Sequence, residues 1–186
     1  MSNDKKDLRR MIRQKMANLP EEYIESSDAA ICDAVAAMPE FLAAPKIFAY
    51  FSVGREVSTR RIIELSFELG KTVALPISLE NSVMEFALFE PDATAMETGS
   101  LNIPQPTLDT ERVLPERGDL ILVPALSYDK TLYRLGQGGG YYDKFLSTCP
   151  AFAVGLCRSE LMMDAVPKEE HDQAVDCLVT EIGTFF

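Results

Sequence analysis

The 186-residue sequence predicts a single α/β domain built on a largely parallel sheet. Short apolar stretches typical of buried strands alternate along the chain with longer segments of helical periodicity. That alternation indicates parallel strands joined by helical crossovers. The composition, with 47% hydrophobic and 25% charged residues, is that of an ordinary globular protein, and no internal repeat marks a second domain.

The first predicted element is a basic amphipathic helix from Asp4 to Asn18. Its apolar residues recur at spacings of three and four, at Leu8, Met11, Ile12 and Met16. Lys5, Arg9 and Arg13 stand four apart, so they line one edge of the helix. In an acidic protein, such a row of cations suits a polyphosphate ligand; a solvated helix face is the alternative.

A second helix is predicted from Pro20 to Met38, and Ser26–Asp28 is a point at which it could break. A short third helix starts at Pro39 and ends by Pro45. Lys46–Phe51 follows as the first buried strand.

Glu56 lies in the loop Ser52–Ser58, which follows that strand and precedes a helix over Thr59–Leu69. Ligands in open α/β sheets bind beyond the carboxyl ends of the strands. We therefore take Glu56 as a candidate ligand-binding residue, with a plain surface carboxylate as the alternative.

Two more strands are predicted at Lys71–Pro76 and Val83–Phe89. The next segment, Glu90–Gly118, contains four prolines and little periodicity, which is typical of a binding loop inside a compact domain. A strand at Leu120–Pro124 returns the chain to the core.

The most distinctive stretch is RLGQGGGYYD, from Arg134 to Asp143, with four glycines within five positions. It follows a buried strand and precedes a helix that starts at Tyr141. A strand, a glycine loop and a helix N-terminus together favour a phosphate site, because unpaired N–H groups and the helix dipole face the anion. A flexible turn is the alternative. The stretch matches neither the P-loop nor the GxGxxG pattern.

The last strands are predicted at Ala151–Leu156 and Ala174–Thr180. His171 is the only histidine, so a transition-metal site lacks ligands. Asp143 and Asp172 together have the oxygen donors that Mg²⁺ prefers alongside substrate phosphates, which makes their pairing a hypothesis.

Charge and cysteine content limit the class of protein. A formal net charge of −11 argues against nucleic acid as a partner, because phosphate backbones require a basic face. The four cysteines show no CxxC spacing and no secretory leader precedes them, so we expect reduced thiols in a cytoplasmic protein. No apolar run approaches transmembrane length, and we expect no membrane association.

Five segments, in the same order, resemble the 5-formyltetrahydrofolate cyclo-ligase family, also called 5,10-methenyltetrahydrofolate synthetases. They are KKDLRRMIRQKM in the first helix, KIFAYFSVGREVST at 46–59, NIPQP at 102–106, the stretch 120–146 that contains RLGQGGGYYDKFL, and VPKEEHDQAVDCLVTE at 166–181. Together they span nearly the whole chain. One segment would be suggestive, whereas five in order are specific.

The resemblance implies a three-layer α/β/α sandwich with a helical N-terminus and one domain over residues 1–186. It also implies ATP- and Mg²⁺-dependent conversion of 5-formyltetrahydrofolate, with or without a polyglutamate tail, to 5,10-methenyltetrahydrofolate, ADP and phosphate. We expect the protein to act as a monomer.

The resemblance also assigns site residues. The nucleotide is expected to contact Lys5, Lys6, Arg9, Arg134, Leu135, Gly136, Gln137, Gly138, Gly139, Gly140, Tyr141 and Tyr142. The folate is expected to contact Tyr50, Glu56, Gln137, Gly138, Gly139, Gly140 and Tyr141. Asp143 and Asp172 are the expected magnesium ligands. The expected catalytic residues are Glu56, Arg134 and Tyr141, with Glu56 positioning the pterin or formyl end.

The sequence departs from the family pattern at Gln137, Leu132, Ala125 and Gly139. Some members carry a lysine where this chain has Gly139, so the phosphate charge here must be met by Arg134 and the first helix. The alternatives are a folate- or nucleotide-binding protein without catalysis, a small-molecule kinase and an acidic interaction protein. The three carboxylates Glu56, Asp143 and Asp172 argue against the first, and the glycine loop argues against the last.

Overall fold

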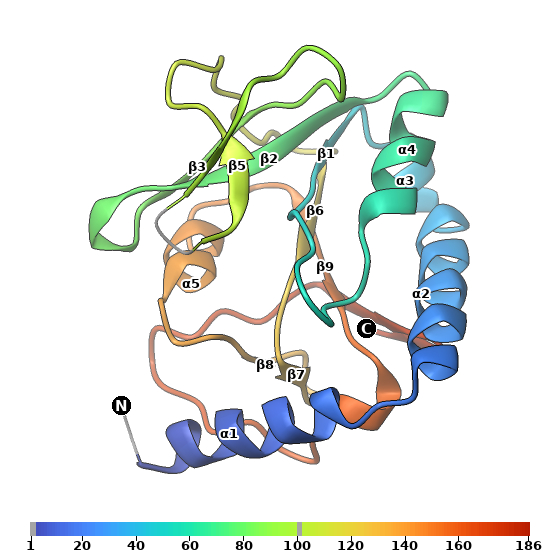
Figure 1. The fold of residues 1–186 in the computed structure, drawn as a ribbon, viewed down its shortest axis with the longest axis vertical. Helices are drawn as coiled ribbons and strands as arrows, with labels where there is room; N and C mark the ends of the chain where they lie inside the picture. Colours follow the sequence, from blue (N-terminus) through green and yellow to red (C-terminus); the bar gives the residue numbers. More distant parts are fainter. Residues whose placement is uncertain (1–2, 100–101) are drawn as a thin grey trace.

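A seven-stranded mixed sheet forms the centre of the computed structural model, which describes residues 3–99 and 102–186 (Figure 1). The strand order is β11-β10-β9-β6-β1-β2-β3. Strands β10, β9, β6, β1 and β2 run parallel, and β3 and β11 pair antiparallel at the two edges. The bounds are β1 (Lys46–Phe48), β2 (Thr72–Ser78), β3 (Met84–Leu88), β6 (Leu120–Val123), β9 (Phe152–Leu156), β10 (Cys177–Thr180) and β11 (Gly183–Phe185). The predicted, largely parallel sheet is confirmed.

Helices cover both faces of this sheet. Helices α2 (Glu21–Ala36), α3 (Pro39–Ala43) and α4 (Arg60–Glu68) lie on one side, and α1 (Asn3–Ala17) and α5 (Tyr141–Leu146) pack on the other (Figure 1). Alternate residues of each strand serve the two layers: Leu120 and Leu122 pack with α2–α4, whereas Ile121 and Val123 pack with the α1 and α5 side. Both faces are buried, which explains why the strands are continuously apolar. The expected three-layer sandwich is confirmed.

Helix α2 is continuous through Ser26–Asp28, so the predicted break there is wrong. Ser27 and Asp28 instead form polar contacts with Arg158. Ser27 is buried, and its hydroxyl donates to the carbonyl of Ile24 and accepts from Arg158. Asp28 pairs with the same arginine. The polar residues therefore mark a buried contact with β9 rather than a helix end.

The proline-rich segment 90–118 is more regular than its sequence indicates. It contains a short antiparallel pair, β4 (Met96–Thr98) and β5 (Pro104–Pro106), although residues 100–101 lie outside the described part of the chain. The side-chain amide oxygen of the buried Gln105 accepts a hydrogen bond from the backbone N–H of Ser78 at 3.0 Å. This bond fixes β5 against β2 beside the sheet.

A second short strand pair connects β6 with the glycine-rich stretch. After β6, strands β7 (Ser127–Tyr128) and β8 (Arg134–Leu135) form an antiparallel hairpin, which sequence reasoning did not predict. Tyr128 is fully buried and its hydroxyl donates to the carbonyl of Val123 at 2.9 Å. The hairpin is thereby anchored on the end of β6, and the glycine loop leaves it at Gly136.

The strand order reverses direction at β1. The chain passes from β1 to β2 on one side, and later returns to β6 on the other side of β1. The loops that leave the carboxyl ends of β1 and β6 therefore diverge, and a crevice forms between them.

The described cysteines Cys32, Cys149, Cys157 and Cys177 are free, in agreement with the expectation of thiols. Within residues 3–99 and 102–186, no helix combines the length and the hydropathy that crossing a bilayer requires.

The contact between Gly155 and Tyr128 predicts a stability effect. A Cβ atom at Gly155 would lie 2.6 Å from the ring of Tyr128, so Gly155→Ala should lower the free energy of unfolding by about 1–3 kcal/mol through overpacking. Gly136→Ala is the matched control, because a Cβ atom there meets nothing within 4 Å. Urea unfolding of both variants measures the difference, and equal stabilities would contradict this account of the contact.

Candidate functional site

A cleft opens at the point where the strand order reverses. Its walls come from α1, from the loops that follow β1 and β6, from the end of β2 and from the segment 169–172. The lining includes Lys5, Arg9, Tyr50, Glu56, Ser78, Arg134, the residues of the glycine loop, Tyr141, Tyr142, Asp143 and Asp172. We define the glycine loop as residues Gly136–Gly140. Nearly all of the predicted site residues thus share one cleft.

The cationic edge of α1 faces this cleft and its rim. Lys5 donates to Asp172 at 2.7 Å, Arg9 donates to the carbonyl of Gly136 at 2.8 Å, and Arg13 donates to Gln137 at 2.6 Å. The row that sequence spacing predicted therefore contacts the glycine loop and the segment 169–172, and of its three residues Arg13 is the one that stays exposed to solvent. Lys6 is exposed and lies outside the residues that line the cleft.

The glycine loop has backbone angles that favour glycine. Gly138 has φ of 103° and Gly140 has φ of 70°, and Gly140 is the left-handed residue that precedes α5. At Gly139 an added Cβ atom would lie 2.9 Å from the ring of Tyr141, so no side chain fits there without movement. Apart from Gln137, the loop consequently has only main chain to present to the cleft. Helix α5 has only six residues, so its dipole adds less than the sequence suggested.

Arg134 organises the floor of the cleft. It is 8% exposed, and its guanidinium donates to the Asp143 carboxylate and to the Gln173 carbonyl, both at 2.6 Å. The same carboxylate oxygen of Asp143 accepts the Gln173 N–H at 3.1 Å. Arg134 therefore holds α5 and the segment that contains Asp172 in one arrangement.

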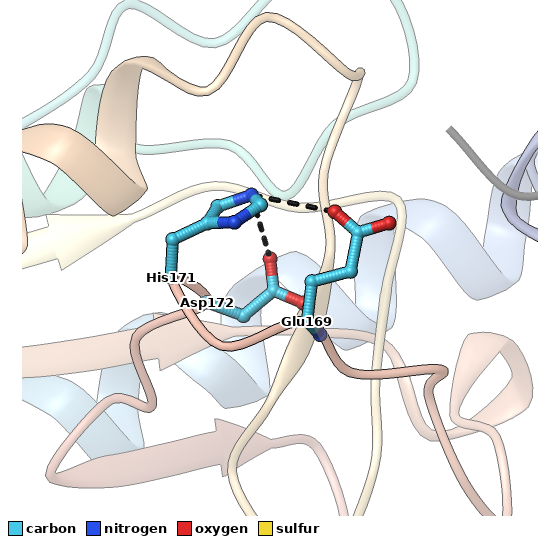
Figure 2. Close-up of side chains that lie close together, drawn as sticks. All are labelled: Glu169, His171 and Asp172. Carbon is cyan, nitrogen blue, oxygen red and sulfur yellow. Dashed lines mark hydrogen bonds and ion pairs between the residues drawn. The ribbon is translucent and has the colours of Figure 1, made fainter.

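Asp172 lies in a short segment with two other side chains that can ligate a metal ion, Glu169 and His171. Burial alone would raise its pKa, but hydrogen bonds from Lys5 and the Glu169 amide, with the Lys5 charge, hold the pKa below its ordinary value. Figure 2 shows Glu169, His171 and Asp172 turned toward one another. Their ligand atoms lie within 4.8 Å of one another, with His171 Nε2 at 3.4 Å from Glu169. Oxygen donors for a cation are thus present at this wall.

Glu56 projects from the loop after β1 into the cleft. One of its carboxylate oxygens accepts the Val53 N–H at 3.1 Å. Burial raises the pKa of Glu56 above its ordinary value, despite that hydrogen bond. Tyr50, at the end of β1, is buried and donates its hydroxyl to the carbonyl of Val57 at 2.7 Å, which closes the loop on itself.

Two tyrosines of α5 complete the site. The Tyr141 hydroxyl donates to the carbonyl of Leu79 at 3.2 Å, which ties α5 to the turn after β2. The Tyr142 hydroxyl is buried and has no hydrogen-bond partner among the described residues. Burial, reinforced by the Glu56 carboxylate, raises the pKa of Tyr142, so this hydroxyl stays protonated.

Some lining residues were not predicted from the sequence. Met84, Ile103 and Gln105 form part of the wall beside β2, and no local pattern distinguishes them from core residues. Leu135, expected to bind nucleotide, lies beside the cleft but is fully buried. The predicted catalytic and metal-binding roles themselves stay predictions.

Comparison with known proteins gives a consistent family assignment. The model of the 5-formyltetrahydrofolate cyclo-ligase family matches residues 1–181. A probable 5-formyltetrahydrofolate cyclo-ligase of Schizosaccharomyces pombe is 30% identical, over 97% of this chain and 96% of the relative. The Escherichia coli 5-formyltetrahydrofolate cyclo-ligase is 28% identical, over 91% and 96%. The structure of Aquifex aeolicus 5,10-methenyltetrahydrofolate synthetase superposes with a TM-score of 0.84 at 29% identity, covering 97% of this chain and 91% of that one.

The buried carboxylate of Glu56 predicts a pH-dependent stability effect. Because burial raises the folded-state pKa, the folded protein holds this proton more tightly than the unfolded chain. Ionised Glu56 therefore costs stability above its folded pKa, and the cost disappears as the pH falls through that pKa. Glu56→Gln should raise the free energy of unfolding at about pH 8, and the gain should shrink toward about pH 4.

Urea unfolding of the wild type and the variant across this range measures the effect. A variant that is less stable at every pH by the same amount would show that the hydrogen bond from Val53 outweighs the cost of burial.

Proposed function

The chain belongs to the 5-formyltetrahydrofolate cyclo-ligase family, and from that premise we propose that it uses ATP to cyclise 5-formyltetrahydrofolate to 5,10-methenyltetrahydrofolate, with release of ADP and phosphate. One observation carries this proposal. The cationic edge of α1, the glycine loop and the Glu56 loop meet in a single cleft. A polyphosphate and an uncharged ring system can therefore lie side by side there.

The phosphate end of the cleft is built for phosphoryl transfer. Catalysis of this reaction is mostly positioning and charge neutralisation. Arg9 contacts the glycine loop, and Lys5, one turn earlier on α1, contacts Asp172, so both cations lie beside the cleft that would hold the phosphates. Arg134 and Arg9 supply the charge that a lysine at Gly139 would provide in other members.

In the first step, the formyl oxygen attacks the γ-phosphorus of ATP, the bond to the bridging oxygen breaks, and ADP departs. The formyl carbon, still bonded to N5, becomes iminium-like and carries phosphate as a leaving group. In the second step, N10 attacks that carbon and loses its proton, while the carbon–oxygen bond breaks and phosphate leaves. The ring closes and all atoms are accounted for.

Glu56 lies at the other end of this arrangement. Its carboxylate, supported by the Val53 N–H, faces the cleft beside Tyr50. We assign it the role of orienting the pterin or formyl end of the folate, so that the formyl oxygen points toward the phosphates. Correct orientation of two reactants contributes strongly to the rate of such a reaction.

The residues present fit a magnesium ion. Asp143 and Asp172 both line the cleft and offer carboxylate oxygens, which are the donors that Mg²⁺ prefers. When bound, Mg²⁺ neutralises phosphate charge. Arg134 and Lys5 hold these two carboxylates in place through hydrogen bonds at 2.6 and 2.7 Å.

The reaction can be tested by absorbance in the methenyl-folate band. Wild-type protein mixed with 5-formyltetrahydrofolate, ATP and Mg²⁺ should give a rise that needs all three components. Asp143→Asn should lower kcat at least about 100-fold, since even outer partners of a metal site are worth 10- to 100-fold. Asp164→Asn, at an exposed position outside the cleft, is the control.

A wild-type protein that binds ATP but gives no rise would contradict the proposed reaction. ADP release without a methenyl product would instead indicate a kinase, and folate binding without turnover would indicate a binding protein.

Neighbouring arginines of α1 test the nucleotide end. Arg9 lines the cleft, whereas Arg10 is exposed and pairs with Asp7. Arg9→Gln should raise the KM for ATP about 10- to 100-fold, because a hydrogen bond to a charged group contributes about 1.5–3 kcal/mol. Arg10→Gln should leave it unchanged. Steady-state kinetics at saturating folate measure both values, and equal effects would place the nucleotide elsewhere.

A further inference from the structure

We propose that Arg158 is a positioning residue for folate recognition, which acts by fixing the backbone of the loop that carries Glu56. The inference rests on the proposed function, because it assigns the Glu56 end of the cleft to the folate. Arg158 lies outside the residues that line the cleft, so its effect must pass through that loop.

Arg158 joins three parts of the chain. It lies two residues after the end of β9 and is 1% exposed. Its Nε and Nη2 donate to Ser27 at 2.9 Å and to Asp28 at 2.5 Å, both in α2. On its other side, Nη1 donates to the carbonyl of Arg55 at 2.8 Å, and Nη2 reaches the carbonyl of Glu56 at 3.4 Å. The guanidinium therefore holds the two carbonyl groups on either side of the Cα atom of Glu56.

Asp28 fixes a third position of the loop by a hydrogen bond. The carboxylate oxygen that accepts from Arg158 also accepts the Ser58 N–H at 3.2 Å. Burial raises the pKa of Asp28, and the Arg158 charge opposes that rise. The loop is thus fixed to α2 and to the segment after β9 at residues 55, 56 and 58.

The segment that carries Arg158 is itself held in place by neighbouring elements. The Ser159 amide and hydroxyl both donate to Glu181, which follows β10. The same carboxylate accepts the Tyr23 hydroxyl of α2 at 2.6 Å. The residue next to Arg158 is therefore tied to β10 and α2, and Arg158 cannot shift without moving elements of the core.

Only an arginine can make this set of contacts. The planar guanidinium presents five N–H donors in a fixed fork, which here serve a hydroxyl, a carboxylate and two carbonyl groups in different directions. A lysine keeps the positive charge beside Asp28 but cannot reach both loop carbonyls. The charge and the geometry of Arg158 can therefore be separated by mutation.

The carboxylate of Glu56 depends on this backbone. Within residues 3–99 and 102–186, its carboxylate is supported by the hydrogen bond from Val53, in the same loop. If the loop moves, Glu56 and Val53 move together, so the carboxylate leaves its place relative to the glycine loop. A shift of about 1 Å in a positioned group can reduce its effect on the order of 100-fold.

The experiment compares Arg158→Lys and Arg158→Met with the wild type. Dissociation constants for 5-formyltetrahydrofolate and, separately, for Mg²⁺–ATP are measured by calorimetry, and stability by thermal unfolding. Phe41→Leu, at a fully buried position of α3, is the control for loss of stability alone. All binding is measured well below the unfolding transition of each variant.

We expect Arg158→Lys to retain most of the stability but to weaken folate binding about 10- to 100-fold, with Mg²⁺–ATP binding changed less than about twofold. Arg158→Met should weaken folate binding at least as much and also lower stability. Phe41→Leu should lower stability with both affinities unchanged. Turnover of the lysine variant should show a raised KM for folate.

Arg158→Lys with wild-type folate affinity would overturn the proposal, as would equal losses of folate and Mg²⁺–ATP affinity. If Arg158→Met does not fold, the folate affinity of Arg158→Lys decides the test. A wild-type protein that binds no folate would overturn the proposed function instead, and this result is distinguishable because it appears without any mutation.

Discussion

The reversal of strand order at β1 is the constraint on which the rest of the site depends. Because β1, β6 and β9 run parallel, their carboxyl ends meet at one edge of the sheet. The chain leaves β1 toward β2 and returns to β6 on the other side, so the loops that follow must separate. Glu56, the glycine loop and the segment with Asp172 follow β1, β6 and β9 respectively, and that topology brings them to one cleft.

Within that cleft, cations are held in place by pairing with carboxylates. Lys5 and Arg134 are both largely buried, and each bonds a carboxylate, Asp172 and Asp143 respectively. Such pairs hold cations and anions at fixed, largely buried places, where their effect on a charged ligand is larger than in water.

The sequence by itself determined the fold class and most of the candidate site. Apolar strands alternating with helices require a covered parallel sheet, and the spacing of Lys5, Arg9 and Arg13 places them on one helix edge. The glycine loop was recognisable because it has four glycines within five positions. These signals are local: each depends on the order of neighbouring residues, which the sequence states directly.

Only the tertiary structure decided which of these features meet and what they contact. Ser27 and Asp28 looked like a helix break, yet they bond an arginine 130 and more positions away in the chain. The sequence likewise did not predict the hairpin β7–β8 or the position of Gln105 in the wall of the cleft. Hydrogen bonds of this kind form between side chains and backbone groups that are distant in sequence, so no periodicity records them, and only the packed sheet brings the partners within reach.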